Sequence, residues 1–126
     1  MRLKILTVVF LLSITHKGFS SYILIPMDAS SQENHLKSYG IAYWVLGQNQ
    51  NIKWLLNYRG GSFLIPNSEA IAKECHIRGV SYDLISDTKT AAILKYISSP
   101  SQNMEAVVLE KAPRIAVYSP SGKQPW

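Results

Sequence analysis

The segment YILIP, residues 22–26, is a continuous apolar run that ends at a proline. A run of this length without polar alternation is typical of a strand covered on both faces, as the strands of a parallel sheet are. Further strand-like segments begin near residues 53, 81 and 114. A spacing of about 30 residues is natural for strand-helix-strand units. The sequence therefore predicts an α/β fold with an open, mostly parallel sheet flanked by helices, in the manner of flavodoxin-like and amidotransferase-like proteins.

Helices are predicted between these strands. The segment SSQE at residues 30–33 has the form of a capping box, so a helix is expected to begin there and to end at Gly47. A second helix is expected from a cap at Asn67 or Ser68 to Arg78, with Gly79 as its stop, and a third over residues 88–97, capped by Asp87.

The first helix is expected to bury a broad face, and its aromatic residues are assigned to the core rather than to a stacking platform. This face consists of Leu36, Tyr39, Gly40, Tyr43, Trp44 and Gly47. Shorter apolar segments at residues 63–65 and 104–109 complete the pattern, the latter as an edge strand.

Composition limits the class of protein. The chain has 126 residues, 47% apolar and 17% charged, which suits about one folded domain and excludes a disordered tail. Its formal charge is +5, but Arg2, Lys4 and Lys17 lie in the first 20 residues, and the remainder holds 10 basic and 8 acidic side chains. Such a small excess does not indicate a nucleic-acid partner.

The first 20 residues have the pattern of a cleavable signal peptide. A basic start, MRLK, precedes an apolar segment at residues 5–15, which is far shorter than the roughly 20 residues that cross a bilayer. Gly18 and Ser20 supply small side chains before a cut at Ser21. We expect export to the periplasm or the exterior, with no stable membrane anchor left after cleavage. A buried first strand or helix is the alternative.

Loops that follow the predicted strands supply a candidate ligand site, because ligands of open α/β sheets bind at the carboxyl ends of strands. The paired glycines after the second strand allow a tight turn or a close backbone approach, with Arg59 as an anion partner, and an ordinary hairpin turn is the alternative. The candidate residues are Asp28, Arg59, Gly60, Gly61, Ser119, Ser121 and Lys123.

Other residues indicate no catalytic group, metal or cofactor. Cys75 is the single cysteine, which excludes an intrachain disulfide, and its mid-helix position favours a small buried side chain over a nucleophile. His16, His35 and His76 are too scattered to indicate a metal site. Gly122-Lys123 lacks the flanking residues of a phosphate-binding loop.

Four blocks of sequence carry a resemblance to a known family: YILIPMD (22–28), NHLKSYGIAYW (34–44), WLLNYRGGSF (54–63) and KAPRIAVYSP (111–120). They resemble the N-terminal part of bacterial proteins of roughly 400 residues that are labelled asparagine synthetase B. The resemblance implies a chain that continues past Trp126. It also implies synthesis of asparagine from glutamine and ATP, which relies on an N-terminal Cys and a Ser-Gly-Gly-x-Asp-Ser loop. Signal removal would expose Ser21 instead, and residues 119–123 lack the second Gly and the Asp.

Two functions remain open. The first is a small-molecule-binding or accessory segment, whose partners are a small ligand and the remainder of its own longer chain. The second is part of an exported amidotransferase- or hydrolase-like enzyme whose catalytic residues lie downstream of Trp126. A strand over residues 114–118 followed by Pro125, which suits a first helical turn, favours a truncated domain in both cases.

Overall fold

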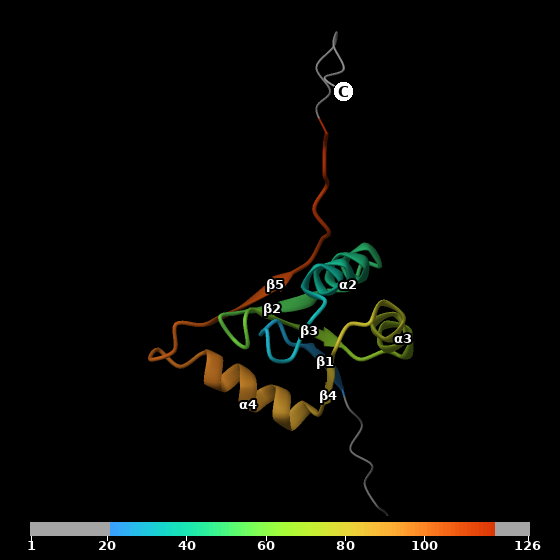
Figure 1. The fold of residues 1–126 in the computed structure, drawn as a ribbon. Coiled ribbons are helices and arrows are strands. Elements are labelled where there is room, and N and C mark those ends of the chain that lie inside the picture. Colours follow the sequence, from blue (N-terminus) through green and yellow to red (C-terminus); the bar gives the residue numbers. More distant parts are fainter. Residues whose placement is uncertain (1–20, 118–126) are drawn as a thin grey trace, which may run out of the picture.

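Residues 21–117 are described by the computed structural model, and they contain five strands and three helices. The elements are β1 (Tyr22–Ile25), α2 (His35–Gly47), β2 (Ile52–Leu56), β3 (Ser62–Pro66), α3 (Glu69–Arg78), β4 (Asp83–Ile85), α4 (Asp87–Ile97) and β5 (Glu105–Leu109). The strands form one sheet in the order β4-β1-β3-β2-β5 (Figure 1).

Every pair of neighbouring strands in this sheet is antiparallel, so the prediction of a mostly parallel, flavodoxin-like or amidotransferase-like sheet is wrong. The difference arises from β3. After β2 the chain turns back within a few residues, and β3 inserts between β1 and β2, antiparallel to both. β1 and β2 therefore run in the same direction, but they are not neighbours.

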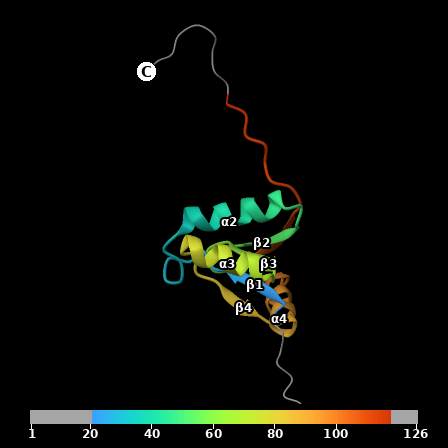
Figure 2. The same ribbon diagram turned by 90° about the vertical axis from the view of Figure 1, so that its right-hand side faces the viewer.

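The connectivity from β1 to β4 is the split β-α-β, or ferredoxin-like, arrangement, with four strands in the order β4-β1-β3-β2. The chain then adds one more helix and one more strand. Helix α4 crosses the face of the sheet opposite α2 and α3, and β5 pairs with β2 at the far edge (Figure 1, Figure 2). The edge strand predicted at residues 104–109 is confirmed as β5.

Helices on both faces of the sheet explain the apolar run at residues 22–26. Ile23 and Ile25 pack in the core cluster beneath α2 and α3, whereas Leu24 packs in the smaller cluster beneath α4. All three side chains are buried. An uninterrupted apolar strand therefore indicates a sheet with helices packed on both faces. Such a sheet can be antiparallel as well as parallel.

Helix α2 buries a different face from the one predicted. Leu36 is 86% exposed, and Tyr39 and Tyr43 are about half exposed, so their assignment to the core is wrong. The helix is apolar around most of its circumference, and spacing alone could not select the buried side. The residues that it buries are Ser38, Ile41, Ala42, Val45 and Leu46.

The helix ends follow the predictions in part. At α3 the Ser68 hydroxyl accepts a hydrogen bond from the Ile71 N–H, and Gly79 ends the helix in the left-handed conformation, as predicted. Helix α4 is capped by Ser86 rather than Asp87. Helix α2 begins at His35 and not in the capping box at residues 30–33, because Ser30 and Ser31 donate their hydroxyls to Asp28.

The strand predicted at residues 114–118 is absent from the part of the chain described here. Residues 114–117 have no regular structure, and Ile115 and Val117 are 80% and 89% exposed. Tyr118, the helix predicted near Pro125 and the signal peptide predicted at residues 1–20 lie outside the described residues. Among residues 21–117, no helix has the length and apolar content needed to cross a membrane.

The buried face of α2 can be tested with two truncations. Ile41→Ala should lower the free energy of unfolding by about 2–5 kcal/mol, because Ile41 is fully buried. Leu36→Ala on the same helix should change it by less than about 0.5 kcal/mol. Urea denaturation followed by circular dichroism measures both, and a larger loss for Leu36→Ala would contradict this placement of the helix.

Candidate functional site

Two of the three predicted loop groups lie together at one end of the sheet. Asp28 follows β1, and Arg59 lies in the turn between β2 and β3. The backbone N–H of Met27 donates to the Arg59 carbonyl at 2.9 Å, which joins the two loops. Asp83 at the beginning of β4 contacts the same guanidinium, so we call Asp28, Ser31, Arg59 and Asp83 the Arg59 cluster.

Each nitrogen of the Arg59 guanidinium donates one hydrogen bond within the protein. Its Nε donates to Asp28 at 3.2 Å and its Nη1 donates to Asp83 at 2.9 Å. Its Nη2 donates to the Ser31 hydroxyl oxygen at 3.0 Å. Each of its three nitrogens therefore has an acceptor from a different residue of the same domain.

The electrostatics of the cluster favour the ionised forms of Asp28 and Arg59. Hydrogen bonds from Ser30 and Ser31, followed by the charge of Arg59, lower the pKa of Asp28 from 3.8 to about 2. Hydrogen bonding to Asp83 raises the pKa of Arg59, and the negative charges of Asp28 and Asp83 act in the same direction. Two carboxylates surround one guanidinium, so the cluster has no spare positive charge for an anionic ligand.

The glycines of the same turn allow two close approaches, both to the protein itself. Gly60 and Gly61 have φ angles of +76° and +92°. A Cβ on Gly60 would lie 2.5 Å from the Met27 carbonyl oxygen, and a Cβ on Gly61 would lie 3.3 Å from the indole nitrogen of Trp54. The close backbone approach expected at this loop exists, and it occurs in a hairpin turn between β2 and β3.

Sequence reasoning missed Gln32, which fixes the loop between β1 and α2. The side chain is buried, and its amide nitrogen donates to the carbonyls of Pro26 and Ser81. Its amide oxygen accepts from the backbone N–H groups of Asn34 and Ser81. In the sequence Gln32 has the features of an ordinary polar loop residue, and only its burial distinguishes it.

The other residues considered in the sequence analysis lie partly outside and partly within the described chain. Ser119, Ser121 and Lys123 lie outside the described residues. The prediction that Cys75 is a buried helical side chain is confirmed, and burial raises the pKa of its thiol to about 11. Within residues 21–117, no three His, Cys, Asp or Glu side chains lie close enough together to hold a metal ion.

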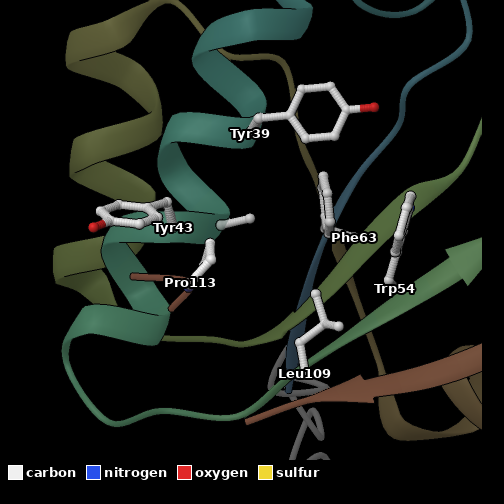
Figure 3. A pocket seen from close by; sticks show the side chains of 7 residues that line it. Tyr39, Tyr43, Trp54, Phe63, Leu109 and Pro113 are labelled. Carbon is white, nitrogen blue, oxygen red and sulfur yellow. The ribbon is translucent and has the colours of Figure 1, made fainter. Parts of the chain in front are cut away.

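A second feature, which we call the aromatic pocket, lies between α2 and the β2, β3 and β5 strands (Figure 3). Its volume is about 320 Å³. The short side chain of Ala42 leaves space beneath the helix at this point. The pocket is lined by Tyr39, Ala42 and Tyr43 of α2, Trp54 of β2, Phe63 of β3, Leu109 of β5 and Pro113 beyond it.

The rings of the aromatic pocket have a defined geometry. Trp54 and Phe63 face each other across β2 and β3 and stack with ring centroids 6.1 Å apart. Tyr39 meets Phe63 edge-on at 5.6 Å, and the Trp54 Nε1 donates to the Gly61 carbonyl at 3.0 Å, which orients the indole. The hydroxyls of Tyr39 and Tyr43 point away from the space between the rings (Figure 3). The walls are therefore apolar and suit a neutral molecule that contains a ring.

The sequence contains little that could have identified this pocket. Its pattern assigns Tyr39 and Tyr43 to the core, and Trp54, Phe63, Leu109 and Pro113 are not distinguished from other apolar residues. Trp54 and Phe63 become neighbours only when residues 52–66 form a hairpin. The hairpin alternative for the glycine turn was the one signal that could have paired them.

Comparisons of the chain with family models, with curated proteins and with solved structures find no match. The inference of a function therefore depends on the two features described above. The Arg59 cluster connects the loop after β1, the turn between β2 and β3 and the beginning of β4, whereas the aromatic pocket has open volume between its rings.

The Arg59 cluster should make stability depend on acidity. The folded-state pKa of Asp28 is depressed, so its carboxylate stabilises the fold above about pH 4, and this contribution is lost as the pH falls toward 2. Asp28→Asn should destabilise the protein at pH 7 and flatten the stability profile between these values. Thermal unfolding measured from pH 2 to pH 7 tests this, with Glu33→Gln in the same loop as the control. An Asp28→Asn profile parallel to that of the unmodified protein would contradict the assignment.

Proposed function

We propose that residues 21–117 form a non-catalytic module that binds a small, neutral, ring-containing molecule in the aromatic pocket. The observation that carries the proposal is a cavity of about 320 Å³ walled by four aromatic side chains. Small-molecule sites are concave and mainly apolar, with volumes from about 300 Å³ upward. The Arg59 cluster is not proposed as the binding site, because its guanidinium is already paired with two carboxylates.

The geometry of the rings favours a ligand with one or two fused rings. The cavity is at the small end of the range for ligand sites, so it suits a molecule of about indole size. The stacked pair of Trp54 and Phe63 forms one wall and the half-exposed Tyr43 lies across from it (Figure 3). A flat ring can contact both sides, whereas a charged group would lose its hydration without gaining a partner.

The test is a titration of the full chain, labelled with ¹⁵N, with indole as the probe and glucose as a polar control. Indole should shift the indole N–H resonance of Trp54 and the backbone resonances of Tyr39 and Tyr43, and glucose should shift none of them. Ala42→Leu, which fills the pocket from α2, should weaken indole binding by about tenfold.

The matched control is Ala92→Leu, the same substitution at an exposed position of α4, which should leave indole binding unchanged. Tyr43→Ala is a second pocket variant for the case in which Ala42→Leu disturbs folding, because Tyr43 is half exposed. Resonance shifts spread over other surfaces, or indole binding that is equal in all variants, would rule out the pocket as the site.

We also propose that the chain is exported and that the module is an accessory segment within a longer protein of the family labelled asparagine synthetase B, which it resembles. Cleavage before Ser21 would keep a residue that belongs to the described domain. The Ser21 N–H donates to the Ile85 carbonyl, and the Ser21 carbonyl accepts from the Asn67 N–H.

Export predicts a defined N-terminus. The chain, produced in a Gram-negative bacterium and recovered from the periplasmic fraction, should begin at Ser21 when its intact mass is measured. Replacing Gly18 and Ser20 by bulky residues should leave the uncleaved chain in the membrane or cytoplasmic fraction. A protein that retains Met1 in the soluble cytoplasmic fraction would contradict the proposal.

A further inference from the structure

An apolar, extended segment follows β5 and leaves the body of the domain (Figure 1). Ala112 packs against the core, and Pro113 lines the aromatic pocket, so the beginning of the segment is held in place. Beyond it, Ile115 and Val117 are 80% and 89% exposed. Their spacing places both on one side of an extended chain, and β-branched residues favour a strand. The segment has the chemistry of a strand without a partner among the described residues.

The edge of the sheet beside this segment is also open. β5 ends the strand order and, among the described strands, pairs only with β2. Val108 on this strand is 50% exposed. An open edge presents unpaired backbone N–H and C=O groups, which favour the addition of another extended segment.

One register matches this segment to this edge. In antiparallel pairing with Ala112 opposite Ala112 of another molecule, Ile115 faces Leu109 and Val117 faces Val107. The same register places Arg114 opposite Glu110 and Ala116 opposite Val108. Shifting the register by one residue would turn Ile115 and Val117 to the other face of the sheet, and Leu109 and Val107 would lose their apolar partners.

We propose that two copies of this chain exchange these segments, so that residues 114–117 of each copy form a sixth strand beside β5 of the other. The interface is isologous, with the two-fold axis at Ala112, where two small side chains meet. It contains two Arg114–Glu110 pairs of opposite charge and two sets of apolar cross-strand pairs, which stabilise antiparallel strands. Pro113 faces Lys111 beside the axis, outside the four-residue strand itself.

A second copy fits the observations better than return of the segment onto its own β5. Residues 112–117 contain no turn and continue, extended, away from the end of β5, so the segment does not fold back onto its own strand (Figure 1). The other edge of the sheet is a poorer acceptor, because β4 has three residues and its Asp83 is bound to Arg59.

The primary test is sedimentation velocity of the full chain over a range of concentrations. The unmodified protein should dimerise, and Arg114→Glu or Glu110→Arg alone should weaken the dimer by at least about tenfold, because each places like charges opposite one another. The double variant carrying both substitutions should recover affinity close to that of the unmodified protein. Leu84→Lys at the half-exposed position on β4 is the control and should leave the dimer unchanged.

A second test locates the register without relying on stability. The double variant Val108→Cys with Ala116→Cys should form a disulfide-linked dimer under mild oxidation, since the two positions face each other across the interface. Each single variant should remain unlinked, and Cys75 is buried and should not contribute. Circular dichroism verifies that each variant is folded.

The outcomes separate the possibilities. A protein that stays monomeric at submillimolar concentration, or a dimer that Leu84→Lys disrupts, overturns the proposal. A dimer that is insensitive to both charge reversals overturns it as well. Recovery by the charge exchange together with the specific disulfide supports it, and neither result depends on ligand binding in the aromatic pocket.

Discussion

The insertion of β3 between β1 and β2 is the constraint on which the other features of this domain depend. It makes the two strand pairs that contain β3 antiparallel, and it requires the chain to reverse within a few residues after β2. That reversal brings the Arg59 carbonyl to the Met27 N–H, with Gly60 against the Met27 carbonyl where a side chain could not fit. It also places Phe63 directly opposite Trp54, which forms the stacked wall of the aromatic pocket.

The sequence predicted the strands and helices better than their arrangement. The positions of β1, β2, α3 and β5 follow from local patterns: an apolar run, a cap at Ser68, a stop at Gly79. The direction of the sheet does not, because burial on two faces produces the same apolar run in parallel and antiparallel sheets. For a similar reason, the apolar circumference of α2 does not determine its buried face, which in the structure includes Ile41 and Val45. The strand predicted at residue 114 depended on composition alone, and apolar β-branched residues need an edge to pair with before they form a strand.

The candidate site could likewise be predicted from the sequence only in part. Charged loop residues are easy to identify in a sequence, and Asp28 and Arg59 do meet in space. Both groups bind partners within the protein. The guanidinium binds Asp28 and Asp83, and the Asp28 carboxylate also accepts hydrogen bonds from the hydroxyls of Ser30 and Ser31. Open volume instead lies where the short side chain of Ala42 faces large rings on two strands. Such a mismatch in size depends on long-range packing, and a sequence pattern contains no information about it.

The two proposed interactions share residues and should therefore influence each other. Leu109 lines the aromatic pocket and would face the partner's Ile115 across the exchanged strand, while Pro113 closes the pocket at the point where the segment leaves the domain. A ligand that packs against Pro113 and Leu109 would contact one residue at the start of the exchanged segment and one residue that pairs with it, so ligand binding and dimerisation would be coupled. By linkage, dimerisation would raise ligand affinity by the same factor that the ligand strengthens the dimer. The coupling requires no movement of the sheet, because both contacts are made at one end of β5 and on the chain that directly follows it.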